Sequence, residues 1–149
     1  MTELTPEECL EVLEGGPIAH IAVVDDGEPY ITPMSYVLAD GEFLFRTVPG
    51  RRTRAMQANS RVCVEVTHLK EDGGWESVLF WGEARLVEDP NRQADVVAAL
   101  LAKYHTESAL GFPPSVFPQE RYVFSIAPQD LTGRASGTGL SSTTRPGRL

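Results

Sequence analysis

Alternating apolar and polar residues along most of the chain predict a protein built mainly from β-strands. Between residues 61 and 67, for example, Val62, Val64 and Val66 fall on one face, and polar or smaller residues fall on the other. Turn signals such as Asp-Asp-Gly and Asp-Gly separate further segments of this kind. Six strands are therefore predicted, the first three as an antiparallel meander, over residues 18–24, 30–38, 43–47, 61–67, 75–87 and 121–126.

Three helical segments interrupt these strands. Thr5 and Glu8 form a Thr-x-x-Glu capping box at the start of the first segment, and a Gly-Gly pair ends it. A Pro-Gly stop precedes the second, over residues 51–59, and Asp89 caps the third, which carries apolar residues at helical spacing. Short strands with few helices are typical of an antiparallel β-barrel.

Length and composition place the chain among single-domain proteins. Its 149 residues are 42% hydrophobic and 23% charged, as in ordinary globular domains. No apolar run approaches the roughly 20 residues of a membrane helix, and the N-terminus lacks a signal peptide pattern, so we expect a cytoplasmic protein. Residues 1–132 are expected to form the folded domain. Residues 133–149 are rich in Gly, Ser, Thr and Arg and are expected to form a flexible tail.

Charge and its distribution suggest a small anionic ligand. The net charge of -8 argues against a broad nucleic-acid surface, and the scattered cysteines and histidines fit no metal site. Four arginines nevertheless cluster along the chain: Arg46, Arg51, Arg52 and Arg54. Arg51 and Arg52 begin a predicted helix, where the backbone favours anions and disfavours cations. The cluster therefore predicts a phosphate site, the alternative being solvated arginines paired with acidic residues.

The order and spacing of five segments resemble the pyridoxamine 5′-phosphate oxidase-like, FMN-binding split β-barrel superfamily. The similarity extends over about residues 4–133 and is greatest to small actinobacterial and nitroimidazole-resistance-like members. The segments are residues 16–22 (GPIAHIA), 28–36 (EPYITPMSY), 43–52 (FLFRTVPGRR), 59–65 (NSRVCVE) and 75–85 (WESVLFWGEAR). The resemblance implies a mainly β fold, a six-stranded antiparallel split β-barrel with α-helices. It also implies a homodimer with FMN at the subunit interface.

The resemblance further implies which residues hold the cofactor. Arg51 and Arg52 match the pair that binds the FMN phosphate, helped by Arg46, Thr47 and Thr53. The flavin ring is expected to lie along one strand segment and beside a second strand, often from the neighbouring subunit. These residues are Pro33, Met34, Ser35 and Tyr36 in the first strand, and Ser77 and Val78 in the second.

The function implied is that of an FMN-binding oxidoreductase that passes hydride or electrons between a reductant and a small-molecule substrate. Because the cofactor supplies such chemistry, no catalytic side chain is assigned. Two alternatives stay open: a flavin-binding protein for storage or sensing, and the same barrel holding deazaflavin F420 or haem. The chain has no C-terminal Arg-x-His motif of the true pyridoxamine phosphate oxidases, so oxidation of vitamin B6 is not expected.

Overall fold

The computed structural model describes residues 1–104 and 122–137. The described helices are α1 (Pro6–Gly15), α2 (Arg51–Ala58) and α3 (Pro90–Tyr104). The described strands are β1 (Thr2–Glu3), β2 (Ala19–Asp25), β3 (Glu28–Met34), β4 (Val37–Ala39), β5 (Glu42–Thr47), β6 (Arg61–Leu69), β7 (Trp75–Glu83), β8 (Arg85–Leu86), β9 (Tyr122–Ile126) and β10 (Gln129–Ala135). The connection expected around residues 111–118 lies outside the described residues, as does the end of the expected tail.

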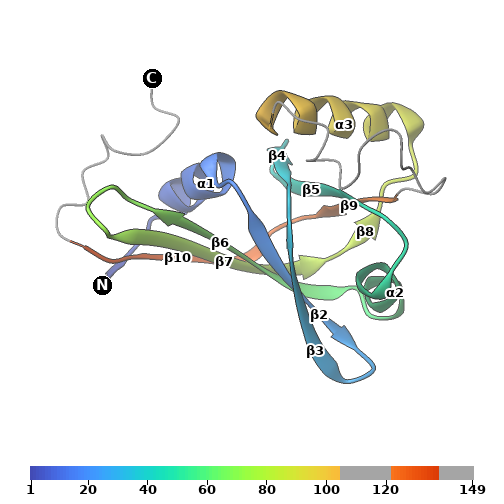
Figure 1. The fold of residues 1–149 in the computed structure, drawn as a ribbon, viewed down its shortest axis with the longest axis horizontal. Helices are drawn as coiled ribbons and strands as arrows, with labels where there is room; N and C mark the ends of the chain where they lie inside the picture. The colour runs from blue at the N-terminus through green and yellow to red at the C-terminus, as the bar shows by residue number, and fades with distance from the viewer. Residues whose placement is uncertain (105–121, 138–149) are drawn as a thin grey trace.

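The strands form two antiparallel sheets rather than one closed barrel. One sheet has six strands in the order β1-β10-β7-β6-β2-β3, and the other has four in the order β4-β5-β9-β8. In Figure 1, α1 lies over β6, β7 and β10, and α3 lies over the four-stranded sheet. The mainly β, antiparallel architecture is confirmed, whereas the count of six strands is wrong because the described residues contain ten.

Two predicted strands are each divided where the chain passes from one sheet to the other. The segment 30–38 is divided between β3 and β4, and the segment 75–87 is divided between β7 and β8. Both pairings of the predicted meander form, β2 with β3 and β4 with β5, but the divided middle strand places them in different sheets, and β5 also pairs with β9. The sequence keeps apolar residues at alternate positions across both crossings, at Met34, Tyr36 and Leu38 and at Ala84 and Leu86, although Leu86 is 41% exposed and Val37 is buried. The pattern alone therefore hides the breaks.

The shared core lies between the two sheets and beneath α1. Its largest fully buried side chains include Tyr36, Phe43, Phe45, Phe80 and Phe124. The rings of Tyr36 and Phe43 are stacked with centroids 4.6 Å apart, and Phe80 meets Phe43 edge-on at 5.5 Å. Such aromatic pairs contribute about 0.5–1.5 kcal/mol beyond the burial of their area. A smaller apolar cluster, which includes Leu44 and Leu100, attaches α3 to the outer side of the four-stranded sheet.

The two sheets meet closely at Gly82 on β7. A Cβ atom at this position would lie 2.5 Å from Ile126 Cγ2 and 2.8 Å from the Ala127 carbonyl oxygen, so only glycine fits without a shift of the backbone. Beyond Ala127 the chain forms β10, which pairs with β7 as far as Ala135. The domain boundary expected at residue 132 therefore falls within a strand.

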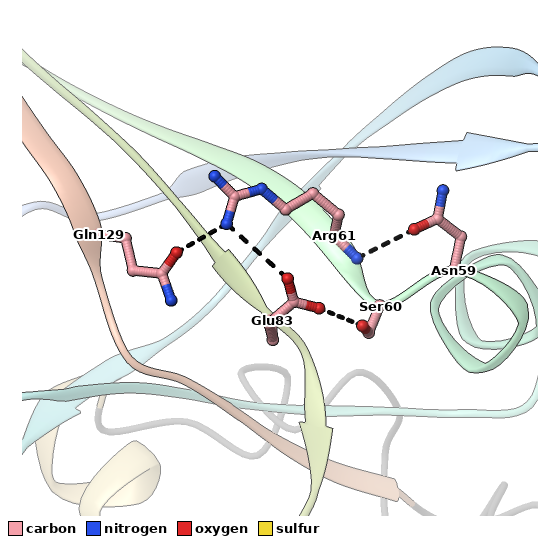
Figure 2. Close-up of polar contacts among 5 residues, drawn as sticks. All are labelled: Asn59, Ser60, Arg61, Glu83 and Gln129. Carbon is pink, nitrogen blue, oxygen red and sulfur yellow. Dashed lines mark hydrogen bonds and ion pairs between the residues drawn. The ribbon is translucent and has the colours of Figure 1, made fainter.

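A polar network fixes the same end of the six-stranded sheet. Arg61 Nη1 donates to Gln129 Oε1 at 2.6 Å and lies 3.7 Å from Glu83 Oε1, and Ser60 donates to the same Glu83 carboxylate (Figure 2). Asn59 Oδ1 accepts from the Arg61 backbone N–H at 3.2 Å. The network connects the end of α2 to β6, β7 and β10, and so it helps to fix where α2 stands.

Candidate functional site

A cationic corner forms where the first turn of α2 approaches β3 and the end of β5. Arg52 Nη1 donates to Thr32 Oγ1 at 2.8 Å and to the Pro33 carbonyl oxygen at 3.4 Å, and Arg52 Nη2 donates to Thr47 Oγ1 at 2.8 Å. The guanidinium lies 5.8 Å from the Phe45 ring centroid. Arg52 therefore joins three elements that are separate in the sequence.

The Arg52 guanidinium is poorly compensated where it lies. Its Nε atom is buried without a hydrogen-bond partner, and no carboxylate in the described residues forms an ion pair with it. Burial lowers the pKa of Arg52, although arginine keeps its charge at any ordinary pH. A buried donor without an acceptor costs about 1–3 kcal/mol. An oxyanion is the group that such a guanidinium fits best.

Arg51 has a different environment from its neighbour. Its Nε donates to Asp25 Oδ2 at 2.6 Å, and its guanidinium lies 4.2 Å above the Tyr30 ring centroid. The Arg51 side chain is 48% exposed. The two members of the arginine pair are therefore not equivalent, because Arg51 is already paired and Arg52 is not.

The two threonine hydroxyls expected to help bind the phosphate have different roles. Thr47 accepts from Arg52 and so belongs to the corner. Thr53 is buried, and its hydroxyl accepts from the Gly50 N–H at 2.8 Å and donates to the Gly50 carbonyl at 2.9 Å, so it closes the loop before α2. Arg46 lies beside Thr47 on β5 and is half-buried.

The segment expected to border a flavin ring runs along an unpaired sheet edge. Among the described strands β3 is the last of its sheet, so one of its edges lacks a strand partner, and Pro33 suits such an edge because it has no N–H to donate. The Met34 and Tyr36 side chains turn into the core, with 6% and 0% exposure, and the Tyr36 hydroxyl donates to the Leu13 carbonyl oxygen. The Pro33 side chain is exposed, and the Ser35 side chain is half-buried and hydrogen-bonded to Tyr104.

Lys103 and Tyr104, in the last turn of α3, contact the same segment and were missed in the sequence. Lys103 Nζ donates to the Tyr36 carbonyl oxygen at 3.0 Å and lies 3.7 Å from the centroid of the Tyr36 ring. The Tyr104 hydroxyl accepts from the Tyr36 N–H at 3.1 Å and donates to the Tyr36 carbonyl at 3.2 Å. The contact depends on how α3 folds back, for which the sequence carries no local signal.

Ser77 and Val78 lie apart from the corner within one chain. Both are on β7, which β6 and β2 separate from β3. The Ser77 hydroxyl donates to Glu65 Oε1 at 2.8 Å, and Val78 is fully buried in the core. The structure therefore brings Arg52, Thr47 and Pro33 together, but it does not bring Ser77 or Val78 to them.

No helix among residues 1–104 and 122–137 has the length and apolar character needed to cross a membrane. The same residues contain no group of three or more His, Cys, Asp or Glu side chains that could hold a metal ion. The corner, the free edge of β3 and the end of α3 meet along residues 33–36, where Arg52 contacts the Pro33 carbonyl and Lys103 contacts the Tyr36 carbonyl. We call these three parts together the β3-edge site.

The two antiparallel sheets define the fold as a split barrel. The cationic side chains along the free edge of β3 define a candidate site for an oxyanion. The chain belongs to the pyridoxamine 5′-phosphate oxidase family, whose model matches residues 5–135. The resemblance of the sequence to this superfamily is thus confirmed.

Individual relatives agree with this assignment. An uncharacterized protein, RA0666, of Rhizobium meliloti is 26% identical, and the match covers 91% of this chain and 95% of the relative. The crystal structure of a FAD-binding protein from Mesorhizobium loti is similar with a TM-score of 0.78 at 28% identity, covering 91% of this chain and 98% of that one. A FAD- and heme-binding protein of Mycobacterium smegmatis shares the fold, with a TM-score of 0.71 at 18% identity over 91% of this chain and 74% of that one.

Proposed function

We propose that the protein binds a flavin, as FMN, at the β3-edge site and acts as an oxidoreductase toward a small-molecule substrate. The observation that carries the proposal is Arg52, a half-buried guanidinium at the start of α2 that forms no ion pair with a carboxylate of the described residues. A phosphate is an acceptor of the right chemistry, because it can accept two or more hydrogen bonds from one guanidinium. The similarity to a FAD-binding protein at 28% identity supports a flavin.

The residues present fit this cofactor. Arg52 and Thr47 would hold the phosphate, with Arg51 at the exposed side and Thr53 keeping the loop before α2 closed. The free edge of β3 offers backbone groups near Pro33 and Ser35 to the polar edge of a flavin ring. A bound flavin would supply hydride and electron transfer, and the protein would bind it, orient it and exclude water.

A second copy of the chain is the partner that we propose. One row on the outer face of the six-stranded sheet places Ile31, Ala22, Cys63 and Trp81 opposite one another on neighbouring strands. Ile31 is 61% exposed, and the other three are half-buried. An apolar row of this kind favours a protein interface. A dimer through this face would also offer a route by which Ser77 of one subunit approaches the site of the other.

Purification without added cofactor tests the proposed function. We expect a yellow protein that releases FMN on denaturation, identified by its mass. Release of FAD instead would keep the flavin and correct the nucleotide, whereas a Soret band, released deazaflavin, or no uptake of any flavin would refute the proposal. Reduction of the bound flavin by NADH or NADPH and reoxidation by an acceptor would support the oxidoreductase, whereas a flavin inert to both would support the storage or sensing alternative.

A further inference from the structure

The last turn of α3 places a positive charge against the backbone of the β3-edge site. The Lys103 ammonium is 3.0 Å from the Tyr36 carbonyl oxygen and packs on the Tyr36 ring. No carboxylate in the described residues forms an ion pair with it. Tyr36 and Tyr104 are the titratable groups that the structure shows in contact with this amine.

The Tyr36 backbone has a hydrogen-bond partner besides this charge. The Tyr36 carbonyl already accepts from the Tyr104 hydroxyl, which also accepts from the Tyr36 N–H. Burial lowers the pKa of Lys103 to about 8, so keeping the amine protonated at neutral pH costs stability rather than adding to it. A methionine could fill the same space along the side chain without that cost.

Lys103 and Arg52 contact the two ends of one short stretch of chain. Arg52 Nη1 contacts the Pro33 carbonyl, and Lys103 Nζ contacts the Tyr36 carbonyl. Three residues span at most about 10 Å when extended. Two cations without carboxylate partners thus stand at either end of the segment, and a single ligand with two anionic ends would match them.

We propose that Lys103 binds the pyrimidine end of the flavin ring and stabilises the negative charge that this end carries when the flavin is reduced. The inference rests on the proposed function, since it assigns the second end of the same site. Charge placed near the ring nitrogens is a known means by which proteins adjust flavin chemistry. The expected consequence is tighter binding of the reduced flavin than of the oxidised flavin.

The test compares Lys103→Met with Lys103→Arg and Tyr104→Phe. We measure the dissociation constant of oxidised FMN and the two-electron midpoint potential of the bound flavin at neutral pH. Lys103→Met should weaken binding of the reduced flavin about tenfold more than binding of the oxidised flavin, which lowers the potential by about 30 mV. Lys103→Arg should keep most of the wild-type potential, and Tyr104→Phe, which retains the charge, should shift it much less.

The outcomes separate this inference from the proposed function. An unchanged potential in Lys103→Met, or an equal shift in Tyr104→Phe, would overturn the inference while the flavin site stands. Failure of the wild-type protein to bind any flavin would overturn both. Lys103→Gln keeps a donor for the Tyr36 carbonyl without the charge, and it replaces the methionine variant with the same expectation if that variant does not fold.

Discussion

Arg52→Ala tests the proposal that Arg52, rather than its neighbour Arg51, holds the FMN phosphate. The structure gives the two side chains different partners, because Arg51 is paired with Asp25 and Arg52 donates to the Thr32 and Thr47 hydroxyls. Arg51→Ala removes a half-exposed ion pair of the kind worth at most about 1 kcal/mol. Arg54→Ala, on the exposed side of α2, serves as a second matched control for the loss of one positive charge.

The magnitude follows from the number of hydrogen bonds to the phosphate. A hydrogen bond to a charged group contributes about 1.5–3 kcal/mol, so losing two of them should cost at least about 3 kcal/mol of binding free energy. That loss raises the dissociation constant for FMN by more than about a hundredfold, because about 1.4 kcal/mol corresponds to a factor of ten. Arg51→Ala and Arg54→Ala should each change it by less than about fivefold, since about 1 kcal/mol is a factor of five.

Arg52→Ala also loses the hydrogen bonds to Thr32 and Thr47, so its free energy of unfolding must be measured as well. About 1 kcal/mol for each neutral bond predicts a loss of about 2 kcal/mol in the free energy of unfolding. FMN fluorescence titrations should therefore be made well below the melting temperature and at one fixed salt concentration, because salt screens surface charge. Binding by folded Arg52→Ala within threefold of wild type, or an equal loss in Arg51→Ala, would refute the assignment of the phosphate to Arg52.

Three further predictions concern stability. Tyr36→Phe leaves the Leu13 carbonyl without its buried hydroxyl donor and should cost about 1–3 kcal/mol in urea unfolding; an unchanged urea midpoint would show that the bond contributes nothing. Gly82→Ala forces a Cβ against Ile126 and should lower the free energy of unfolding by more than about 1 kcal/mol. Gly50→Ala is the control and should lower it less, because the nearest atom to its added Cβ is the Val48 carbonyl oxygen at 4.0 Å. Burial lowers the pKa of Lys103 from 10.5 to about 8. Between these two pH values the unfolded chain therefore holds a proton that the folded chain has lost, so the free energy of unfolding should rise with pH. The rise should be smaller in Lys103→Met, and parallel pH profiles of the two proteins would contradict this prediction.

Local signals in the sequence predicted the individual elements well. The Thr5–Glu8 capping box forms at the start of α1, and Val62, Val64 and Val66 are all buried on one face of β6. Such features depend on residues a few positions apart, and their physical causes lie within the segment itself.

What the sequence did not reveal depends on packing between distant segments. The break between β3 and β4 is set by which sheet each half joins, and the alternation of apolar residues is the same for either choice. The difference between Arg51 and Arg52 depends on Asp25 and Thr32, which lie some twenty residues away or more. Lys103 reaches Tyr36 across 67 positions of sequence, and only the folded chain brings them into contact.

The in-and-out alternation along residues 33–36 has a practical use for redesign. Pro33 presents its side chain outward and Ser35 is half-buried beside Tyr104, whereas Met34 and Tyr36 are anchored in the interior and the Tyr36 backbone is held by α3. Libraries that vary only positions 33 and 35 would change the lining offered to an incoming molecule while the interior stays intact. Altered selectivity and unaltered folding can therefore be sought independently within four consecutive residues.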